Sequence, residues 1–269
     1  MIAWPPLEGV GVWVSLFAAV LMGGLLGVLG GGGSILSVPI FVYGFGIAAS
    51  VATGPSLLVV GATAAIGAAS AHRRGLVRWK EAIPFVLGAV PVAVVVKAFF
   101  VPWLPGQWGP ITKEQGILVL FSLLMLLAGR GMIWPPKAAE GAAPKSMNTP
   151  VAFMLGAGVG FLAGLVGAGG GFLIVPALVL VAGLAMPEAV GTSLAIIAIQ
   201  SLAAGASSWP TLSPAVRGVA LVTLALAFAG LFLGQRLARG WKPAGLRRGF
   251  GIFIWVAGAA ILAKELLLT

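Results

Sequence analysis

Two glycine-rich runs are the part of this sequence best suited to binding an anion. The first, Gly30–Gly33, is glycine throughout, and the second reads GAGGG over residues 167–171. Glycine within a helix costs about 1 kcal/mol relative to alanine, so each run predicts a tight hinge followed by a new helix. A helix start presents unpaired N–H groups and a positive dipole end, which attract anions. The predicted anion-binding residues of the hinges are Gly30, Gly31, Gly32, Gly33 and Ser34 in the first run and Gly169, Gly170 and Gly171 in the second.

Hydroxyl and amide side chains extend this polar chemistry along one face of each of two apolar segments. They are spaced by seven residues, as Ser56, Thr63 and Ser70 in one segment and as Ser193, Gln200 and Ser207 in the other. Thr192 adds a hydroxyl beside Ser193. Such groups either line a pathway and donate to an anion, or hold helices together at about 0.6 kcal/mol each. For Gln200 we favour the functional role, because an unpaired amide inside a membrane costs several kcal/mol.

The glycines also have an alternative interpretation as packing residues. Four-residue spacing of glycine lets two membrane helices approach closely. The spacing occurs at Gly23, Gly27 and Gly31, and again at Gly156, Gly160 and Gly164. Beyond each hinge, Pro39 and Pro176 lie inside a short apolar segment and are predicted to break its helix.

The composition requires that these residues lie in a membrane protein. Of the 269 residues, 60% are hydrophobic and 8% are charged. Soluble domains have about 25% charged residues, so a soluble enzyme and a nucleic-acid binder are excluded. Cysteine and aspartate are missing, and the single histidine, His72, is not placed to activate Ser34 as a nucleophile. We predict no catalytic residue, no metal site and no cofactor.

Ten apolar segments cover most of the chain, and basic residues in the loops between them give most of the net charge of +10. Two of them, 35–47 and 172–186, are short for a bilayer about 30 Å thick, so full crossing and re-entry both remain open. Ten crossings with both termini outside place 12 basic residues inside and 3 outside, whereas eight crossings give no clear bias. The positive-inside rule therefore favours ten crossings. The basic loops predicted to be cytoplasmic are 72–80, 130–145 and 236–248.

An internal repeat relates the two halves of the chain at an offset of 137 residues. GVLGGGGSILSVP at 27–39 and GLVGAGGGFLIVP at 164–176 share seven of 13 positions. Five crossings per half would invert the second half relative to the first, as in many secondary transporters. The predicted fold is an all-α polytopic membrane protein of two five-helix inverted repeats. The repeats are residues 1–136 and 151–269, joined by a polar linker at 137–150.

The glycine motifs are similar to those of a known transporter family. GGGGSILSVPIF at 30–41, GAGGGFLIVPAL at 167–178 and AVGTSL at 189–194 resemble the paired motifs of the TauE/SafE sulfite exporter family, as does the basic HRRGLVRWK at 72–80. This resemblance implies a membrane carrier for sulfur-containing anions such as sulfite or organosulfonates. The chain departs from a strict repeat at Pro55, where the second half has the hydroxyl of Thr192.

The resulting expectation is a secondary transporter in the bacterial inner membrane. A sulfite or sulfonate anion would bind at the midplane between the hinges, and one repeat would rock against the other. The expected partners are the anion, the lipid bilayer and a second copy in a homodimer, with no nucleic acid. An anion channel of the same architecture and a non-transporting scaffold with a dry interior are the alternatives. The direction of transport and the coupling ion are left open by the sequence.

Overall fold

A computed structural model describes residues 10–105, 107–108, 111–134, 148–166 and 171–267. These residues are almost entirely helical, which confirms the predicted all-α class, apart from a two-residue antiparallel pairing of β1 (Gln107–Trp108) with β2 (Ile111–Thr112). The chain divides into two compact units. Unit 1 comprises Met1–Arg78 and Val190–Trp241, and unit 2 comprises Trp79–Ala189 and Lys242–Thr269. Each unit therefore draws helices from both halves of the sequence.

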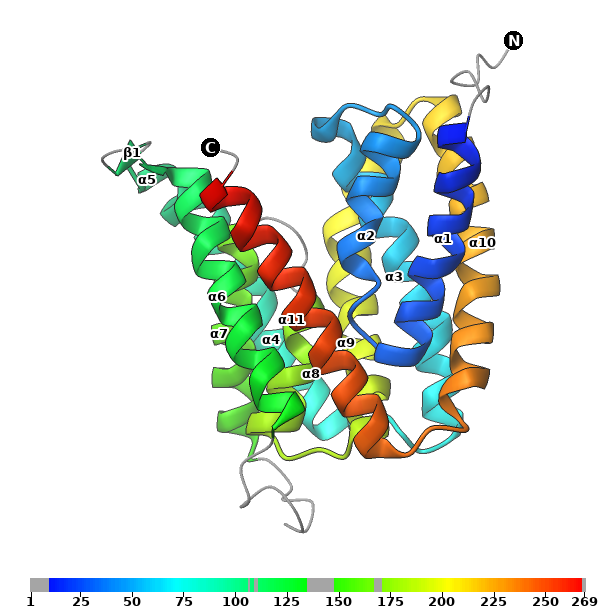
Figure 1. The fold of residues 1–269 in the computed structure, drawn as a ribbon, viewed down its shortest axis with the longest axis vertical. Helices are drawn as coiled ribbons and strands as arrows, with labels where there is room; N and C mark the ends of the chain where they lie inside the picture. Colours follow the sequence, from blue (N-terminus) through cyan, green and yellow to red (C-terminus); the bar gives the residue numbers. More distant parts are fainter. Residues whose placement is uncertain (1–9, 106, 109–110, 135–147, 167–170, 268–269) are drawn as a thin grey trace. The chain divides into compact units, whose positions relative to one another are not determined.

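Unit 1 is built around one long helix from each half. The helix α1 (Val10–Leu29) packs along α10 (Pro214–Ala238) over much of its length (Figure 1). The remaining elements of the unit are α2 (Ser34–Pro39), the π-helical segment η1 (Ile40–Gly44), α3 (Ala49–Arg73), α9 (Met186–Gly205) beyond its first turn, and the 3-10 segment η5 (Ala206–Thr211).

Glycine makes the contact between α1 and α10 possible. A Cβ at Gly23 would collide with the carbonyl of Ala227, and one at Gly27 would collide with that of Leu231. Backbones that approach this closely tolerate only glycine at the contact. Because residue numbers rise together along the contact, the two helices run in the same direction. The packing interpretation is thus correct for these two glycines.

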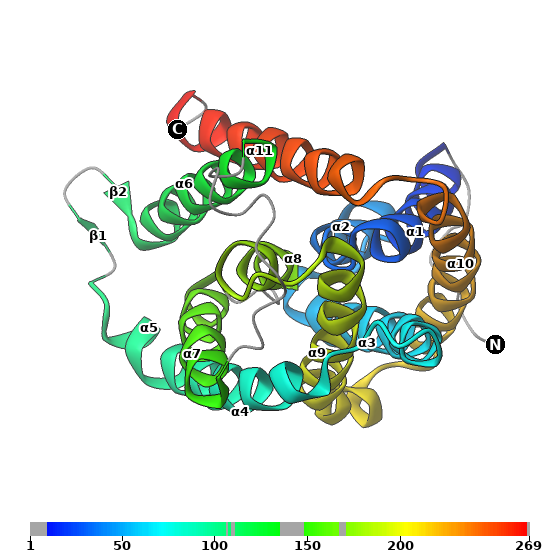
Figure 2. The same cartoon turned by 90° about the horizontal axis from the view of Figure 1, so that it is seen from below.

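Unit 2 repeats the same arrangement with the halves exchanged. The helix α4 (Trp79–Val95) packs along α7 (Thr149–Val166), and the two lie side by side in Figure 2. The other elements are the π-helical segment η2 (Val96–Phe100), α5 (Val101–Trp103), α6 (Lys113–Ile133), α8 (Gly171–Pro176), the π-helical segment η4 (Ala177–Val181) and α11 (Pro243–Leu267).

The contact between α4 and α7 also depends on glycine. A Cβ at Gly156 would collide with the carbonyl of Phe85, and one at Gly160 would collide with that of Ala89. Both helices again run in the same direction. Gly158, between these two, faces outward and would have no heavy atom within 4 Å of its Cβ.

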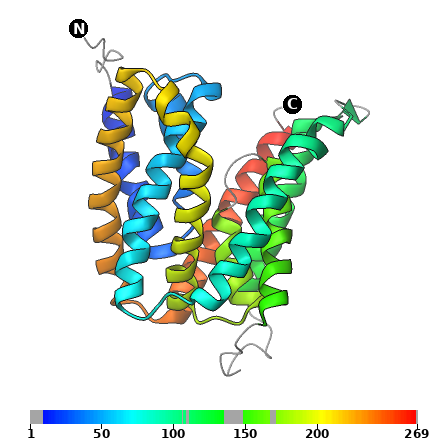
Figure 3. The same ribbon diagram turned by 180° about the vertical axis from the view of Figure 1, so that it is seen from behind.

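Within each unit, one pair of helices from equivalent positions of the two halves runs in opposite directions. In unit 1, Gly67 of α3 packs on Leu194 of α9, whereas Gly61, six residues earlier, packs on Leu202. Figure 3 shows α3 and α9 side by side. In unit 2, α6 and α11 pair in the same way, with Gly129 beside Trp255 and Met125 beside Gly258. Both pairs are therefore antiparallel.

Element boundaries agree at the offset of 137 residues. Both α2 and α8 are six residues long and begin at equivalent positions, and each is followed by a five-residue π-helical segment. Gly46 and Gly183, which are also equivalent, have φ angles of 64° and 67°. The division of the sequence into two repeats and a linker stays a prediction.

Each of the ten predicted apolar segments contains a helix. Seven of the described helices are long and apolar enough to cross a membrane, and Ser34–Gly44, Thr149–Leu165 and Gly171–Val181 are shorter apolar helices. The helical path continues through Pro39 and Pro176 instead of breaking. The hydrogen bonding is α-helical up to each proline and π-helical after it. The change occurs because proline has no N–H to donate to the preceding turn.

Candidate functional site

The first glycine run forms the predicted hinge. α1 ends at Leu29 and α2 begins at Ser34, with Gly30 to Gly33 buried between them. Gly30 has a φ of 75°, a conformation that glycine adopts without strain. Its N–H donates to the carbonyl of Leu26 at 2.9 Å, which closes the last turn of α1. The hinge therefore lies inside unit 1 and reverses the direction of the chain.

The hinge packs against the second turn of α9. An ideal Cβ at Gly30 would lie 2.5 Å from Ser193 Oγ and 2.9 Å from Val190 Cα. Ser193 is fully buried, and its hydroxyl donates to the carbonyl of Val190 at 2.9 Å. The structure thus brings together Gly30 and Ser193, which are 163 residues apart and were both predicted as site residues.

A chain of serine hydroxyls runs from α3 to the hinge. Ser56 donates to Ser37 at 2.7 Å, Ser37 donates to the carbonyl of Ser34 at 2.7 Å, and Ser34 donates to the carbonyl of Gly31 at 2.8 Å. Ser37 is buried and was missed by the sequence reasoning. Its position one turn after Ser34, on the same helix face, is the signal that could have indicated it.

Several polar groups of the hinge already have partners within the chain. The N–H of Ser34 donates to the carbonyl of Gly31 at 3.3 Å, and the N–H of Leu36 donates to that of Gly33 at 3.1 Å. An anion at the hinge would have to displace these bonds or use other N–H groups.

Thr192 anchors a loop. Its side chain is buried, and its Oγ1 accepts the N–H of Arg78 at 3.0 Å. The neighbouring Gly191 leaves room for the carbonyl of Leu76. Thr192 therefore holds the connection between α3 and α4 against α9, while the adjacent Ser193 faces Gly30.

The remaining predicted polar residues lie along the helices away from these contacts. Thr63 is buried and its hydroxyl donates to the carbonyl of Val59 in its own helix at 2.7 Å. Gln200 is half-buried on α9, about two turns beyond Ser193. The buried amide that joins helices of unit 1 is instead Gln235 on α10, which the sequence reasoning missed. It accepts from Ser70 at 3.0 Å and donates to the carbonyl of Gly67 at 3.5 Å.

The second hinge is described only at its end. Gly169 and Gly170 lie outside the described residues. Gly171 begins α8 and is buried. The aromatic ring of Phe172, the next residue, packs edge-on against Phe121 of α6 with 4.9 Å between the ring centroids.

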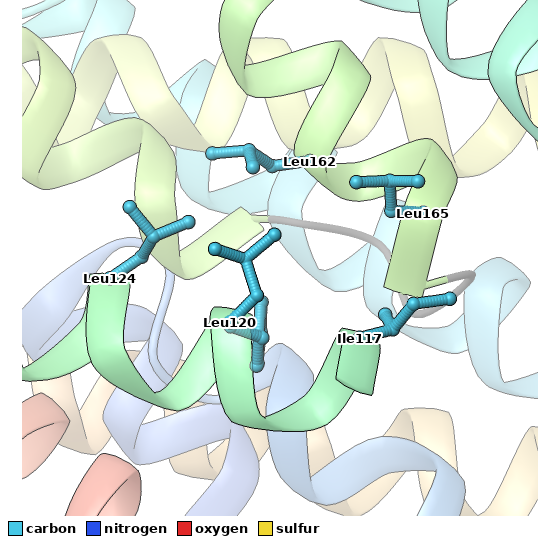
Figure 4. A pocket seen from close by; sticks show the side chains of 6 residues that line it. Ile117, Leu120, Leu124, Leu162 and Leu165 are labelled. Carbon is cyan, nitrogen blue, oxygen red and sulfur yellow. The ribbon is translucent and has the colours of Figure 1, made fainter. Parts of the chain in front are cut away.

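The described residues of unit 2 line a crevice and a separate open cavity. One is an apolar crevice between α6 and α7, lined by six residues that include Leu120 and Leu162 and too narrow to admit water (Figure 4). The other is an open cavity of about 450 Å³ at the N-terminal ends of α4 and α7, where Lys80, Glu81 and Asn148 contribute polar groups. The first is too apolar to bind an anion.

Large apolar side chains cover the outer faces of the helices. Phe17, Phe99 and Met154 are each at least 70% exposed, which no soluble protein of this composition would tolerate on so many helices. Helices of this length with apolar outer faces define a multi-pass membrane protein.

Comparison with known proteins gives the family. The model of the family described as "Sulfite exporter TauE/SafE" matches residues 15–261, so the chain belongs to the TauE/SafE family of membrane transporters. Two proteins of Xylella fastidiosa, from strains 9a5c and Temecula1, are each 34% identical over 189 residues, covering 67% of this chain and 67% of each relative. Both are named probable membrane transporter proteins. No solved structure gives a significant match.

Proposed function

We propose that this transporter is a secondary carrier of small sulfur-containing anions, sulfite or an organosulfonate. The observation that carries the proposal is the buried hinge Gly30–Gly33, packed against Ser193 of α9, in a family named for sulfite export. Glycine allows an anion to reach backbone N–H groups, and hydroxyls complete its shell by donating hydrogen bonds.

The charge distribution of unit 1 supports an anionic substrate. Residues 10–78 and 190–241 contain no aspartate or glutamate. An anion among these residues would meet no negative side chain. The hydroxyls of Ser56 and Thr63 on α3 could donate to it by turning away from Ser37 and from the carbonyl of Val59, their acceptors in this structure. The same absence of carboxylates gives a cation no counter-charge.

The helix directions support ten crossings in two inverted repeats. With ten crossings, α3 and α9 are the third and the eighth spans and must run oppositely. With eight crossings they would be the second and the sixth spans and would run in the same direction. The observed pair is antiparallel, as is the pair of α6 with α11. An inverted repeat is the architecture in which one half can rock against the other.

The ends of the helices support the proposed placement of the basic loops. α3 and α10 end side by side, since Ser70 and Gln235 form a hydrogen bond in their last turns. The loops 72–80 and 236–248 therefore emerge at the same end of unit 1, which we assign to the cytoplasmic side of a bacterial inner membrane.

Transport of radiolabelled sulfite into proteoliposomes tests the proposed function. We expect saturable uptake that unlabelled sulfonates inhibit and that a proton or sodium gradient stimulates. Absence of flux above that of empty liposomes under either gradient would refute the carrier, and single-channel currents without saturation would indicate a channel.

A matched pair of serines tests the site separately from the substrate. Ser193→Ala should reduce sulfite uptake at least tenfold and leave the folded yield unchanged. Ser122→Ala is the control, because Ser122 is equally buried and also donates to a carbonyl three residues earlier, but lies in unit 2. Equal uptake by the two variants would exclude Ser193 from the site.

A further inference from the structure

The last turns of α3 and α10 bring two arginines together in unit 1. Ser70 Oγ donates to Gln235 Oε1 at 3.0 Å, which fixes these two side chains against each other. Arg74 stands four residues after Ser70, and Arg239 stands four residues after Gln235. Residues four apart lie on the same face of a helix, one above the other. Gly67 lies beside Leu231 and Ser70 bonds with Gln235, so α3 and α10 run in the same direction. Arg74 and Arg239 therefore come together just beyond this hydrogen bond.

Hydrogen bonds at the end of α3 hold Arg74 in place. Gly75 has a φ of 69°, and its N–H donates to the carbonyl of His72 at 2.9 Å. The N–H of Leu76 donates to the carbonyl of Ala71 at 3.0 Å, which completes a Schellman cap. The side chain is fixed as well, since Arg74 Nε donates to the carbonyl of Ser70 at 3.1 Å. The terminal fork of the guanidinium carries four further N–H groups.

The two positive charges repel, and no carboxylate occurs among the described residues of unit 1 to neutralise them. Partial burial lowers the pKa of Arg74, and the charge of Arg239 lowers that pKa further. Arginine nevertheless stays protonated at any physiological pH, so the pair cannot relieve its repulsion by losing a proton. The sequence has no aspartate or glutamate in residues 10–78 or 190–241. Each helix C-terminus offers only about half a negative charge.

The surroundings of the pair place it at the level of lipid headgroups. Arg74 and Arg239 are exposed, and each directly follows a helix long and apolar enough to span the bilayer. Close to Arg239 in the chain, Leu237 is 66% exposed and Trp241 is 54% exposed. Tryptophan concentrates at the interface between lipid and water, where lipid phosphates lie.

We propose that Arg74 and Arg239 together bind the phosphate of an anionic phospholipid. Two guanidinium forks can each donate a pair of parallel hydrogen bonds to phosphate oxygens. The bound phosphate supplies the negative charge that the described residues of unit 1 lack, and it joins the ends of α3 and α10. Arg73 in the last turn of α3 and Arg236 in the last turn of α10 are also exposed and strengthen the local positive field.

Native mass spectrometry of the full chain tests this site with phosphatidylglycerol and phosphatidylcholine as probes. Each arginine near a membrane surface contributes about 1 kcal/mol to binding an anionic lipid, so the wild type should prefer phosphatidylglycerol about thirtyfold. Arg74→Gln/Arg239→Gln should abolish the preference. The control is Arg217→Gln/Arg130→Gln, which removes the same charge from the other end of α10 and from α6. Equal preference in both double variants, or none in the wild type, would overturn the site.

Two further measurements keep the test decisive. Should the double variant fold poorly, the single exposed substitution Arg239→Gln should still reduce the preference about fivefold, and an unchanged preference would refute the pairing. Inorganic phosphate added to protein in phosphatidylcholine distinguishes a lipid from a free oxyanion. Millimolar phosphate that protects the wild type but not the double variant against unfolding, without any preference for phosphatidylglycerol, would overturn the lipid assignment.

Discussion

Ser193 Oγ occupies the space into which a side chain at Gly30 would project. An added Cβ at Gly30 would lie 2.5 Å from that oxygen, and the backbone there has a φ of 75°. Two independent effects, a steric clash and backbone strain, therefore require glycine at this position. The relationship links the hinge of the first half to a helix of the second half.

We expect Gly30→Ala to destabilise the protein by about 1–3 kcal/mol from backbone strain alone, with the clash added to it. Unfolding by SDS, followed by circular dichroism, measures the loss. Gly46→Ala is the control, because Gly46 has a φ of 64° but no heavy atom within 4 Å of an added Cβ. Equal losses in the two variants would show that the contact with Ser193 carries no penalty.

The hydrogen bond between Ser56 and Ser37 should show a measurable coupling energy. Hydrogen bonds between membrane helices average about 0.6 kcal/mol and reach about 1.7 kcal/mol. Because this bond is 2.7 Å long and buried, we expect a value in the upper half of that range. A double-mutant cycle with Ser56→Ala and Ser37→Ala measures it, and additive effects of the two substitutions would contradict it.

Glycines on one helix should differ sharply in their tolerance of larger side chains. Gly160→Val should strongly reduce the yield of folded protein, because its Cβ would collide with the carbonyl of Ala89 on α4. Gly158→Val should fold normally, since Gly158 faces open space two residues away. Size-exclusion chromatography of the detergent-solubilised variants compares them. Similar yields would mean that α4 and α7 do not pack as described.

Cysteine labelling should place two equivalent alanines on opposite sides of the membrane. Ala48 and Ala185 are separated by 137 residues, both are exposed, and each precedes a spanning helix. Ten crossings put Ala48→Cys outside and Ala185→Cys inside, whereas eight crossings put both on the same side. The native chain has no cysteine to interfere. Reaction of an impermeant maleimide with both sites in intact cells would rule out ten crossings.

The two amides of unit 1 should respond differently to replacement by leucine. Gln235→Leu should cost about 1–3 kcal/mol of stability, because Ser70 and the carbonyl of Gly67 would lose their buried partner. Gln200→Leu should reduce anion uptake with little loss of stability, as Gln200 is half-buried and lies on the same face of α9 as Ser193, two turns further along. Unfolding and uptake assays on both variants separate these roles; unchanged uptake in Gln200→Leu would favour a structural function.

Local sequence signals were sufficient to predict the helices and the first hinge. Composition alone marks the ten apolar segments. Consecutive glycines mark the break at Gly30, because glycine weakens a helix whatever the helix packs against. The prolines illustrate the limit of such local reasoning. Pro39 removes one N–H, but the wider turn of η1 accommodates the loss, so the helical path continues.

Partners that depend on tertiary packing could not be read from the sequence. Ser37 bonds with a residue 19 positions away, and Gln235 bonds with one 165 positions away. Nothing in the seven-residue spacing of Ser56, Thr63 and Ser70 indicates that Ser70 meets α10 and Ser56 meets α2. Thr192 likewise anchors a loop because the chain after α3 returns to α9, where the N–H of Arg78 donates to the Thr192 hydroxyl.

The mixed origin of each unit determines when this protein can finish folding during its synthesis. Unit 1 needs residues up to Trp241, and unit 2 needs the last helix of the chain. Until α10 has been synthesised and inserted, the glycine face of α1 has no helix to pack against in the bilayer. Insertion of the first half therefore yields an unfinished intermediate, and a nascent chain stopped at the linker would be a substrate for membrane quality control.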